Sequence, residues 1–262
     1  MIGKVLTIAG SDSGGGAGVQ ADIKTITMHG CYAMSVITAL TAQNTCEVSG
    51  ILEVPPEFVA AQMDAVFTDL RPDAVKIGMV SGSGTVHVLA SKLREYKPKN
   101  IVIDPVMIST SGQRLLQPQA MNALIVELLP LADILTPNIP EAEALSGLTI
   151  SDIADMKAAA ALLSERFDSA VLIKGGHLPD SATDVLCDRG KTVELPGQRV
   201  KTENTHGTGC TLSAAIASNL SKGMNNMVSI CTAKGYLASA LRAGFDIGKG
   251  KGPLLHNFNI AH

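Results

Sequence analysis

The sequence predicts an α/β fold in which helices cover both faces of a mostly parallel sheet. Short runs of β-branched and aliphatic residues recur along the 262 residues and alternate with helical patterns, as in proteins with parallel sheets. With 46% hydrophobic and 17% charged residues, the chain can bury a large core. No linker rich in Pro, Gly or Ser and no repeat of about 20 to 50 residues divides it. We therefore expect a single domain over residues 1–262.

The predicted strands lie at six places: Val5–Ala9, Ser35–Leu40, Val75–Ile77, Ile101–Ile103, Ile134–Thr136 and Val171–Lys174. A helix is expected between the last two strands, because apolar residues recur there three and four positions apart: Ile153, Met156, Ala160, Leu163 and Phe167. Ser151 precedes this run and is its candidate N-cap. The apolar face of this helix should pack on the sheet.

Charge and cysteine content exclude several classes of protein. The 21 Lys and Arg residues against 24 Asp and Glu residues give a formal net charge of −3, so neither nucleic acid nor an anionic membrane is an expected partner. The cysteines form no C-x-x-C pair and no zinc-like spacing, which predicts reduced thiols. Neither a signal peptide nor a membrane span of about 20 apolar residues is evident. We expect a cytoplasmic protein.

Polar residues follow four of the predicted strands: the glycine-rich segment 10–16, Asp104, Asn138 with Glu141, and Lys174. Open α/β sheets bind ligands at the carboxyl ends of their strands. Any one of these residues could be a helix cap or a turn residue. Four polar strand ends together predict a ligand site.

Two glycine motifs resemble those of other nucleotide-binding classes, but each lacks a residue that its class requires. Residues 16–21 fit the dinucleotide pattern G-x-G-x-x-G/A, but residues 33–46 lack the acidic residue that would hold the ribose. This disfavours a dinucleotide-dependent oxidoreductase. Residues 190–192 read Gly-Lys-Thr like the tail of a P-loop, but Val185 stands where the loop needs glycine. Because residues 193–197 read as strand and turn, we expect a hairpin there with its lysine exposed.

A stronger signal is the segment Thr205–Thr211, which opens into a helix of small residues over 212–218. Gly207 and Gly209 allow successive N–H groups to face outward at the positive end of that helix, which predicts an anion hole. Cys210 lies in the first turn, where a thiol pKa tends to fall and a thiolate could accept a proton from a hydroxyl. The alternative, a small buried apolar residue, is expected for the other four cysteines.

Seven segments resemble one known family: GSDSGGGAGVQAD at 10–22, TAQNT at 41–45, DPVM at 104–107, TPNIPEAEAL at 136–145, LIKGGH at 172–177, NTHGTGC at 204–210 and GKGKGP at 248–253. Together they resemble the bacterial hydroxymethylpyrimidine/phosphomethylpyrimidine kinases of thiamine biosynthesis, in the ribokinase-like superfamily. The resemblance covers nearly the whole chain. It implies a single-domain, three-layer α/β/α kinase, usually a homodimer. Its members use ATP and Mg²⁺ to phosphorylate 4-amino-5-hydroxymethyl-2-methylpyrimidine and then its monophosphate.

The resemblance assigns roles on the phosphate side of the site. Cys210 stands where sugar kinases of the superfamily place an aspartate base, and either a base or a positioning role is open to it. The anion hole comprises Gly207, Thr208 and Gly209. The residues around ATP comprise Lys174, Asn138, Asp104 and Glu141. Asp104 and Glu141 would also hold Mg²⁺, in part through water.

The resemblance also assigns the pyrimidine pocket to Gln43, Asp22, Met79 and Val106. The carboxamide of Gln43 offers one acceptor and two donors, which suits an amino group beside a ring nitrogen. A pyridoxine or pyridoxal kinase of the same fold is the alternative, and Gln43 favours the pyrimidine. The polar loop 108–113 is expected to close over the substrate as a flap. The catalytic residue types argue against a binding protein without activity.

Overall fold

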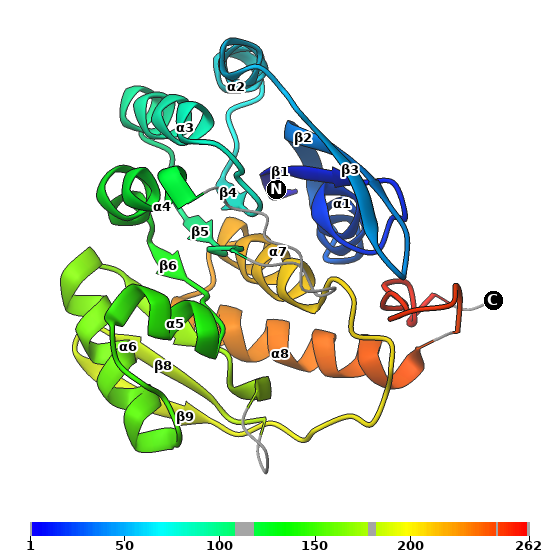
Figure 1. The fold of residues 1–262 in the computed structure, drawn as a ribbon, viewed down its shortest axis with the longest axis vertical. Coiled ribbons are helices and arrows are strands. Elements are labelled where there is room, and N and C mark those ends of the chain that lie inside the picture. Colours follow the sequence, from blue (N-terminus) through cyan, green and yellow to red (C-terminus); the bar gives the residue numbers. More distant parts are fainter. Residues whose placement is uncertain (1, 108–117, 178–181, 245, 261–262) are drawn as a thin grey trace.

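The chain folds around one twisted sheet with helices on both faces (Figure 1). The computed structural model describes residues 2–107, 118–177, 182–244 and 246–260. Within them, nine strands have the order β3-β2-β1-β4-β5-β6-β7-β8-β9. The pairs from β2 through β7 are parallel, whereas β3, β8 and β9 are antiparallel to their neighbours. The predicted mostly parallel sheet is confirmed.

The bounds of the strands are β1 (Lys4–Asp12), β2 (Tyr32–Gln43), β3 (Val48–Glu53), β4 (Ala74–Ile77), β5 (Ile101–Ile103), β6 (Ile134–Leu135), β7 (Ala170–Ile173), β8 (Asp184–Asp188) and β9 (Lys191–Leu195). The bounds of the helices are α1 (Gly18–Met28), α2 (Pro56–Asp69), α3 (Ser83–Tyr96), α4 (Pro118–Ala123), α5 (Ile139–Ser146), α6 (Ile153–Phe167), α7 (Thr208–Ser221) and α8 (Asn226–Ala243). Single turns of other helix types are η1 (Leu124–Leu128), η2 (Leu129–Leu131) and η3 (Gly175–His177).

Two apolar cores lie on the two faces of the sheet. Alternate residues of a strand point to opposite faces, so Ile101 and Ile103 join the core under α2 to α6 while Val102 joins the core under α1, α7 and α8. Both faces are therefore buried, which explains why the parallel strands read as continuous apolar runs. The three-layer α/β/α prediction is confirmed.

All six predicted strands form, and the expected hairpin connects β8 and β9. Arg189 and Gly190 both have positive φ, 50° and 74°, which is the backbone of a two-residue type I′ turn. Lys191 follows it and is exposed. The Gly-Lys-Thr segment is thus a hairpin, as predicted, and not a phosphate loop.

The predicted helix of residues 153–167 is α6, but its N-cap is Asp152 rather than Ser151. The Asp152 carboxylate accepts the backbone N–H of Asp155 at 2.9 Å. The Asp155 carboxylate in turn accepts the backbone N–H of Ser151 at 2.9 Å. Ser and Asp are both good N-cap residues, so the sequence alone did not distinguish Ser151 from Asp152. The hydrogen bonds of the structure identify Asp152 as the N-cap.

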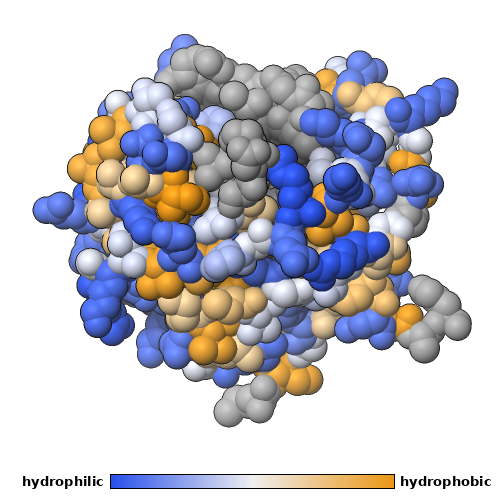
Figure 2. Space-filling model, turned by 90° about the horizontal axis from the view of Figure 1, so that it is seen from below, coloured by the Kyte–Doolittle hydropathy of each residue, from blue (hydrophilic) through white to orange (hydrophobic). Residues whose placement is uncertain are grey.

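All five cysteines are free thiols, as predicted. Cys31 and Cys187 are buried, but Cys46 and Cys231 are exposed, so the expectation of a core position was wrong for those two. Cys46 lies in the turn after β2, and Cys231 lies on α8 among the residues that line the large cavity, so neither belongs to an apolar core. In the described ranges we find no helix long and apolar enough to cross a membrane. Hydrophilic and hydrophobic residues are interspersed on the face seen in Figure 2.

The topology places the functional elements at one end of the sheet. From β1 the chain crosses through α1 to β2 on one side, and the following parallel strands β4 to β7 extend on the other side. The strand order reverses at β1, and a crevice opens at such a point beyond the carboxyl ends of the strands. Helix α7 packs against β1, β4 and β5.

Candidate active site

A cavity of about 2010 Å³ opens at the carboxyl ends of the parallel strands. Its lining contains every predicted site residue except Asp22: Gln43, Met79, Asp104, Val106, Asn138, Glu141, Lys174, Gly207, Thr208, Gly209 and Cys210. The fold therefore brings together residues from distant segments of the sequence. The predicted flap, residues 108–113, lies outside the described residues.

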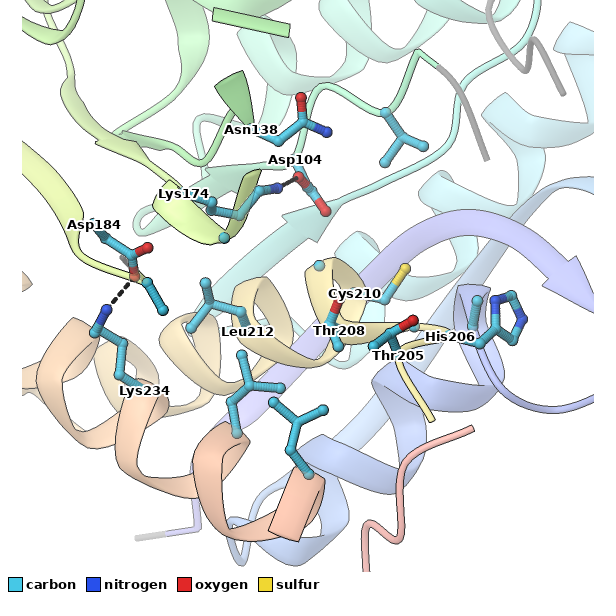
Figure 3. A pocket seen from close by; sticks show the side chains of 18 of the residues that line it. Asp104, Asn138, Lys174, Asp184, Thr205, His206, Thr208, Cys210, Leu212 and Lys234 are labelled. Atoms are coloured by element: carbon cyan, nitrogen blue, oxygen red, sulfur yellow. Dashed lines mark hydrogen bonds and ion pairs between the residues drawn. The ribbon is translucent and has the colours of Figure 1, made fainter. Parts of the chain in front are cut away.

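The phosphate end of the cavity, as we name the surroundings of Lys174, concentrates charge. The Lys174 ammonium donates to the Asp104 carboxylate at 2.7 Å and lies 4.0 Å from Glu141 Oε2. A Cβ built on Gly209 would lie 3.0 Å from Asp104 Oδ2, so a side chain there would crowd the carboxylate. Figure 3 shows this ion pair next to the N-terminal turn of α7. A lysine and the positive end of a helix thus share one edge of the cavity.

Asn138 and Glu141 cap α5 in a reciprocal arrangement. Asn138 Oδ1 accepts the backbone N–H of Glu141 at 2.9 Å, and Glu141 Oε2 accepts the backbone N–H of Asn138 at 2.8 Å. This capping box fixes both side chains where they line the cavity. Burial raises the pKa of Glu141 to about 7, although the nearby Lys174 charge opposes the shift. Glu141 therefore changes its ionisation near neutral pH.

The predicted anion hole begins at Gly207, which is the N-cap of α7. Its φ of 81° is in the left-handed region, and a Cβ there would clash with the carbonyl oxygen of Gly16. Glycine is needed at this position on both counts. In the described chain, the N-terminal turn of α7 has no side-chain cap and no acidic residue. Its outward N–H groups are therefore suited to an external anion.

Cys210 lies in the first turn of α7, as predicted, but its pKa moves in the opposite direction. Burial raises the pKa of the thiol to about 11, and the charge of Lys76 and the backbone N–H of Gly18 oppose this without outweighing it. The prediction of a lowered pKa was wrong because it considered the helix terminus and not desolvation. The free protein therefore holds Cys210 as a neutral thiol at neutral pH.

Asp22 is fully buried between α1 and the sheet and does not line the cavity. Its carboxylate accepts from the Lys76 ammonium at 2.7 Å and from the Thr7 hydroxyl at 2.5 Å. Burial alone lowers the pKa of Lys76, but the charge of Asp22, the hydrogen bond to it and the other acidic groups nearby together outweigh that effect and keep the ammonium protonated. We expected Asp22 to contact the substrate, but in this structure it pairs with Lys76 instead. A fully buried lysine needs such a counter-charge.

The pyrimidine end of the cavity, as we name the surroundings of Gln43, contains two residues that sequence reasoning missed. His206 Nε2 lies 3.0 Å from Asp12 Oδ2, and Gln43 Nε2 lies 3.3 Å from the same imidazole nitrogen. All three side chains line the cavity. Asp12 and His206 lie inside the motifs GSDSGGG and NTHGTGC, but their pairing joins segments 194 residues apart.

A further ion pair lines the cavity beyond Lys174. The Lys234 ammonium of α8 contacts the Asp184 carboxylate, as the dashed line in Figure 3 marks. Asp184 also accepts the backbone N–H of Gly175 at 2.8 Å. The pair therefore ties α8 and β8 to the glycines that follow β7. The sequence offered no signal for this contact, because its partners lie on separate elements.

Known proteins are similar to this chain in sequence and in fold. A hydroxymethylpyrimidine/phosphomethylpyrimidine kinase of Rhizobium meliloti is 52% identical over 96% of both chains. A solved phosphomethylpyrimidine kinase from Clostridium difficile is 44% identical over 91% of this chain and 99% of that chain, with a TM-score of 0.83. An ADP complex of pyridoxal kinase from Bacillus subtilis is 35% identical over 98% of both chains, with a TM-score of 0.91. The family model for phosphomethylpyrimidine kinase matches residues 12–255, and the chain belongs to that family.

Proposed function

We propose that this protein uses ATP and Mg²⁺ to phosphorylate 4-amino-5-hydroxymethyl-2-methylpyrimidine and then its monophosphate. The observation that carries the proposal is that one cavity contains both Gln43 and the anion hole beside Cys210. The Gln43 amide can pair with an amino group next to a ring nitrogen. The pyrimidine hydroxymethyl group would then point toward the N-terminus of α7. Relatives that are known as hydroxymethylpyrimidine/phosphomethylpyrimidine kinases support the same substrate.

Transfer of the phosphoryl group depends mainly on positioning and on neutralising charge. The backbone N–H groups at Gly207, Thr208 and Gly209 would face the moving group, and Lys174 would balance phosphate charge. Cys210 would contact the substrate hydroxyl. Because its pKa is about 11, Cys210 would remain a neutral thiol and would position the hydroxyl by a hydrogen bond. The hydroxyl proton would pass to an oxygen of the transferred phosphoryl group. A loose transition state makes little demand on a base.

Asp104 and Glu141 would hold Mg²⁺ together with the ATP phosphates. Their carboxylate oxygens are the donors this ion prefers, and such sites normally keep several waters. Within the described residues no three acidic, His or Cys side chains gather into a complete metal site. Two carboxylates beside Lys174 fit an ion that arrives with ATP. Bound Mg²⁺ would neutralise phosphate charge, and Lys174 would orient Asp104 for it.

The proposal extends to one kinase domain that acts as a homodimer. A single sheet running from β3 to β9 supports one domain over residues 1–262. Three large apolar side chains are exposed on β2, β3 and α2: Leu40 is 45% exposed, Leu52 67% and Phe58 61%. Exposed apolar groups favour association. Sedimentation equilibrium would test this. A mass of one chain at micromolar concentration would contradict the homodimer.

The experiment for the function is an assay of ADP release with Mg-ATP, in which hydroxymethylpyrimidine and pyridoxal are offered separately. Products are separated by mass into monophosphates and diphosphates. We expect the pyrimidine diphosphate, with pyridoxal slow or inert. Pyridoxal kinase is the second candidate, because solved pyridoxal kinases superpose with TM-scores up to 0.91. Faster turnover of pyridoxal without any pyrimidine diphosphate would establish that candidate.

A further inference from the structure

The amide of Gln43 lies between two hydrogen-bonding neighbours. One end of the amide is 3.1 Å from the Thr41 hydroxyl, and the other end is 3.3 Å from Nε2 of His206. The backbone of Gln43 is also fixed, because the Ser13 hydroxyl accepts its N–H at 2.8 Å and donates to its carbonyl at 2.7 Å. The position of the side chain is thus well determined. What remains open is which end of the amide is oxygen.

Asp12 determines where the proton on His206 lies. Its carboxylate accepts backbone N–H groups from Gly14 at 2.8 Å, Gly16 at 3.0 Å and Ala17 at 2.8 Å. Burial alone raises the pKa of Asp12, but the hydrogen bonds from His206 and the backbone outweigh it, so the carboxyl stays ionised. An ionised carboxylate can only accept. The imidazole must therefore carry its proton on Nε2, the atom 3.0 Å from Asp12 Oδ2.

A protonated Nε2 on His206 decides the orientation of the amide. With its nitrogen toward the imidazole, Gln43 would set two N–H donors against each other at 3.3 Å. Turned by 180°, the amide keeps its shape and places its carbonyl oxygen there as a second, weaker acceptor of the N–H that Asp12 accepts, in a three-centre hydrogen bond. Its nitrogen then faces the Thr41 hydroxyl, which can accept while it donates to the carbonyl of Ser11 at 3.0 Å. Thr41 tolerates either orientation, whereas His206 tolerates one.

We propose that Asp12 and His206 are positioning residues that lock the Gln43 amide with its oxygen toward the imidazole, and thereby select an aminopyrimidine edge. An amide offers two acceptor sites and two N–H donors. His206 uses one acceptor site and Thr41 uses one N–H. One acceptor and one donor remain side by side for the ligand. They fit an amino group next to a bare ring nitrogen, and the inverted edge of a 4-oxo-pyrimidine, with N–H beside C=O, does not fit.

The lock is built into the backbone around it. A Cβ on Gly16 would overlap the His206 ring, so the imidazole packs directly on the glycine-rich turn. The His206 backbone N–H donates to the carbonyl of Gly252 at 3.1 Å, and the imidazole side chain is 11% exposed. These contacts hold the ring against rotation. The amide orientation is therefore set before any ligand arrives.

The test is calorimetric binding of two probes, 4-amino- and 4-oxo-5-hydroxymethyl-2-methylpyrimidine, to the intact protein and three variants. His206→Leu removes the donor. His206→Gln retains an N–H at the Nε2 position and should rescue. His87→Leu is the matched control, because His87 also pairs with a carboxylate, Glu127 at 2.8 Å, but lies outside the cavity lining. Circular dichroism melting confirms that each variant is folded.

We expect the natural protein to prefer the 4-amino probe by at least ~10-fold, as bidentate amide pairing to a base edge does. His206→Leu should lower this ratio to about 3-fold or less, because the released amide can turn. His206→Gln and His87→Leu should keep the ratio. A general loss of structure would weaken the binding of both probes alike and would leave the ratio of their affinities unchanged. An unchanged ratio in a folded His206→Leu variant overturns the proposal.

The inference rests on the proposed function. The experiment distinguishes a failure of the inference from a failure of that function. If the natural protein binds the 4-amino probe selectively but transfers no phosphoryl group to it, the proposed function fails and the lock is still measured. If the protein phosphorylates the pyrimidine and His206→Leu retains full selectivity, the lock fails and the function stands. If the natural protein binds neither probe, both fail.

Discussion

The two ends of the cavity differ in the interactions that hold their side chains in place. At the pyrimidine end, Asp12, His206 and Gln43 form a hydrogen-bonded chain in which the backbone also takes part. At the phosphate end, Lys174 and Asp104 form an ion pair with a second carboxylate, that of Glu141, 4.0 Å from the ammonium. The first end is held in place by its own hydrogen bonds and keeps one donor and one acceptor of Gln43 open. The second holds charges that a phosphate would rearrange.

This difference teaches how one site can serve two successive phosphorylations. A fixed set of hydrogen-bond donors and acceptors would bind the pyrimidine ring, which is the same in both phosphorylations. Charge, a helix terminus and a lysine accept phosphates whose number and position change between steps. Electrostatic attraction tolerates such displacement better than bidentate hydrogen bonding does. Substitutions at the two ends should therefore separate into different kinetic effects.

The largest expected effect comes from the ion pair beneath both ends. Lys76 and Asp22 are both fully buried, so Lys76→Met leaves a buried carboxylate without its partner. The free energy of unfolding should fall by about 3–5 kcal/mol. Chemical denaturation measures it. The double variant Asp22→Asn with Lys76→Met should recover most of the loss, and equal stability of the single and double variants would contradict the pairing.

Lys174→Met should have the next largest effect and should act on phosphoryl transfer. Loss of a preorganised positive group facing transition-state charge costs roughly 10²–10³-fold in kcat. Steady-state ADP release measures it, with Lys191→Met as control because that lysine is exposed on the β8–β9 hairpin. Binding of the pyrimidine alone should hardly change. Similar losses in both lysine variants would indicate that general charge, not this site, matters.

Cys210 should be unreactive in the ligand-free protein. With a pKa of about 11 instead of the ordinary 9.0, about 100-fold less thiolate exists at pH 8. Alkylation of Cys210 by iodoacetamide should be slower than that of a free cysteine by that factor and should rise tenfold per pH unit toward pH 11. Mass spectrometry of the peptide containing Cys210 follows it. Alkylation as fast as that of free cysteine at pH 8 would contradict the raised pKa and would support Cys210 as a thiolate base.

The sequence predicted the strands and the lining of the cavity well, because both depend on local signals. Runs of apolar residues mark buried parallel strands, and polar residues after them mark the strand ends. Strand β3 was missed because Val48–Glu53 is half exposed and interrupted by a glycine. The hairpin turn at Gly190 was found because glycine tolerates positive φ.

The errors concern quantities that the neighbouring sequence does not contain. Asp22 follows the glycine-rich loop, but the rotation of α1 turns it inward to Lys76. A lysine inside the apolar strand sequence AVKI was a signal for this pair. The pKa of Cys210 depends on desolvation by the whole fold. The pairing of Asp12 with His206 joins residues that only the folded sheet brings together.

The smallest effect tests the comparison most directly. Gln43→Met preserves much of the side-chain volume but removes the amide, so it should raise KM for the aminopyrimidine by about 10-fold, as the loss of roughly 1.4 kcal/mol of hydrogen bonding implies. KM for ATP should stay within about 2-fold, because Gln43 is bonded to Thr41, Ser13 and His206 and not to the Lys174 cluster. Lys174→Met should instead lower kcat and leave binding of the pyrimidine nearly unchanged. If Gln43→Met changed both constants equally, the cavity would act as one coupled unit, and a fixed ring-reading end separate from an adaptable phosphate end would no longer describe it.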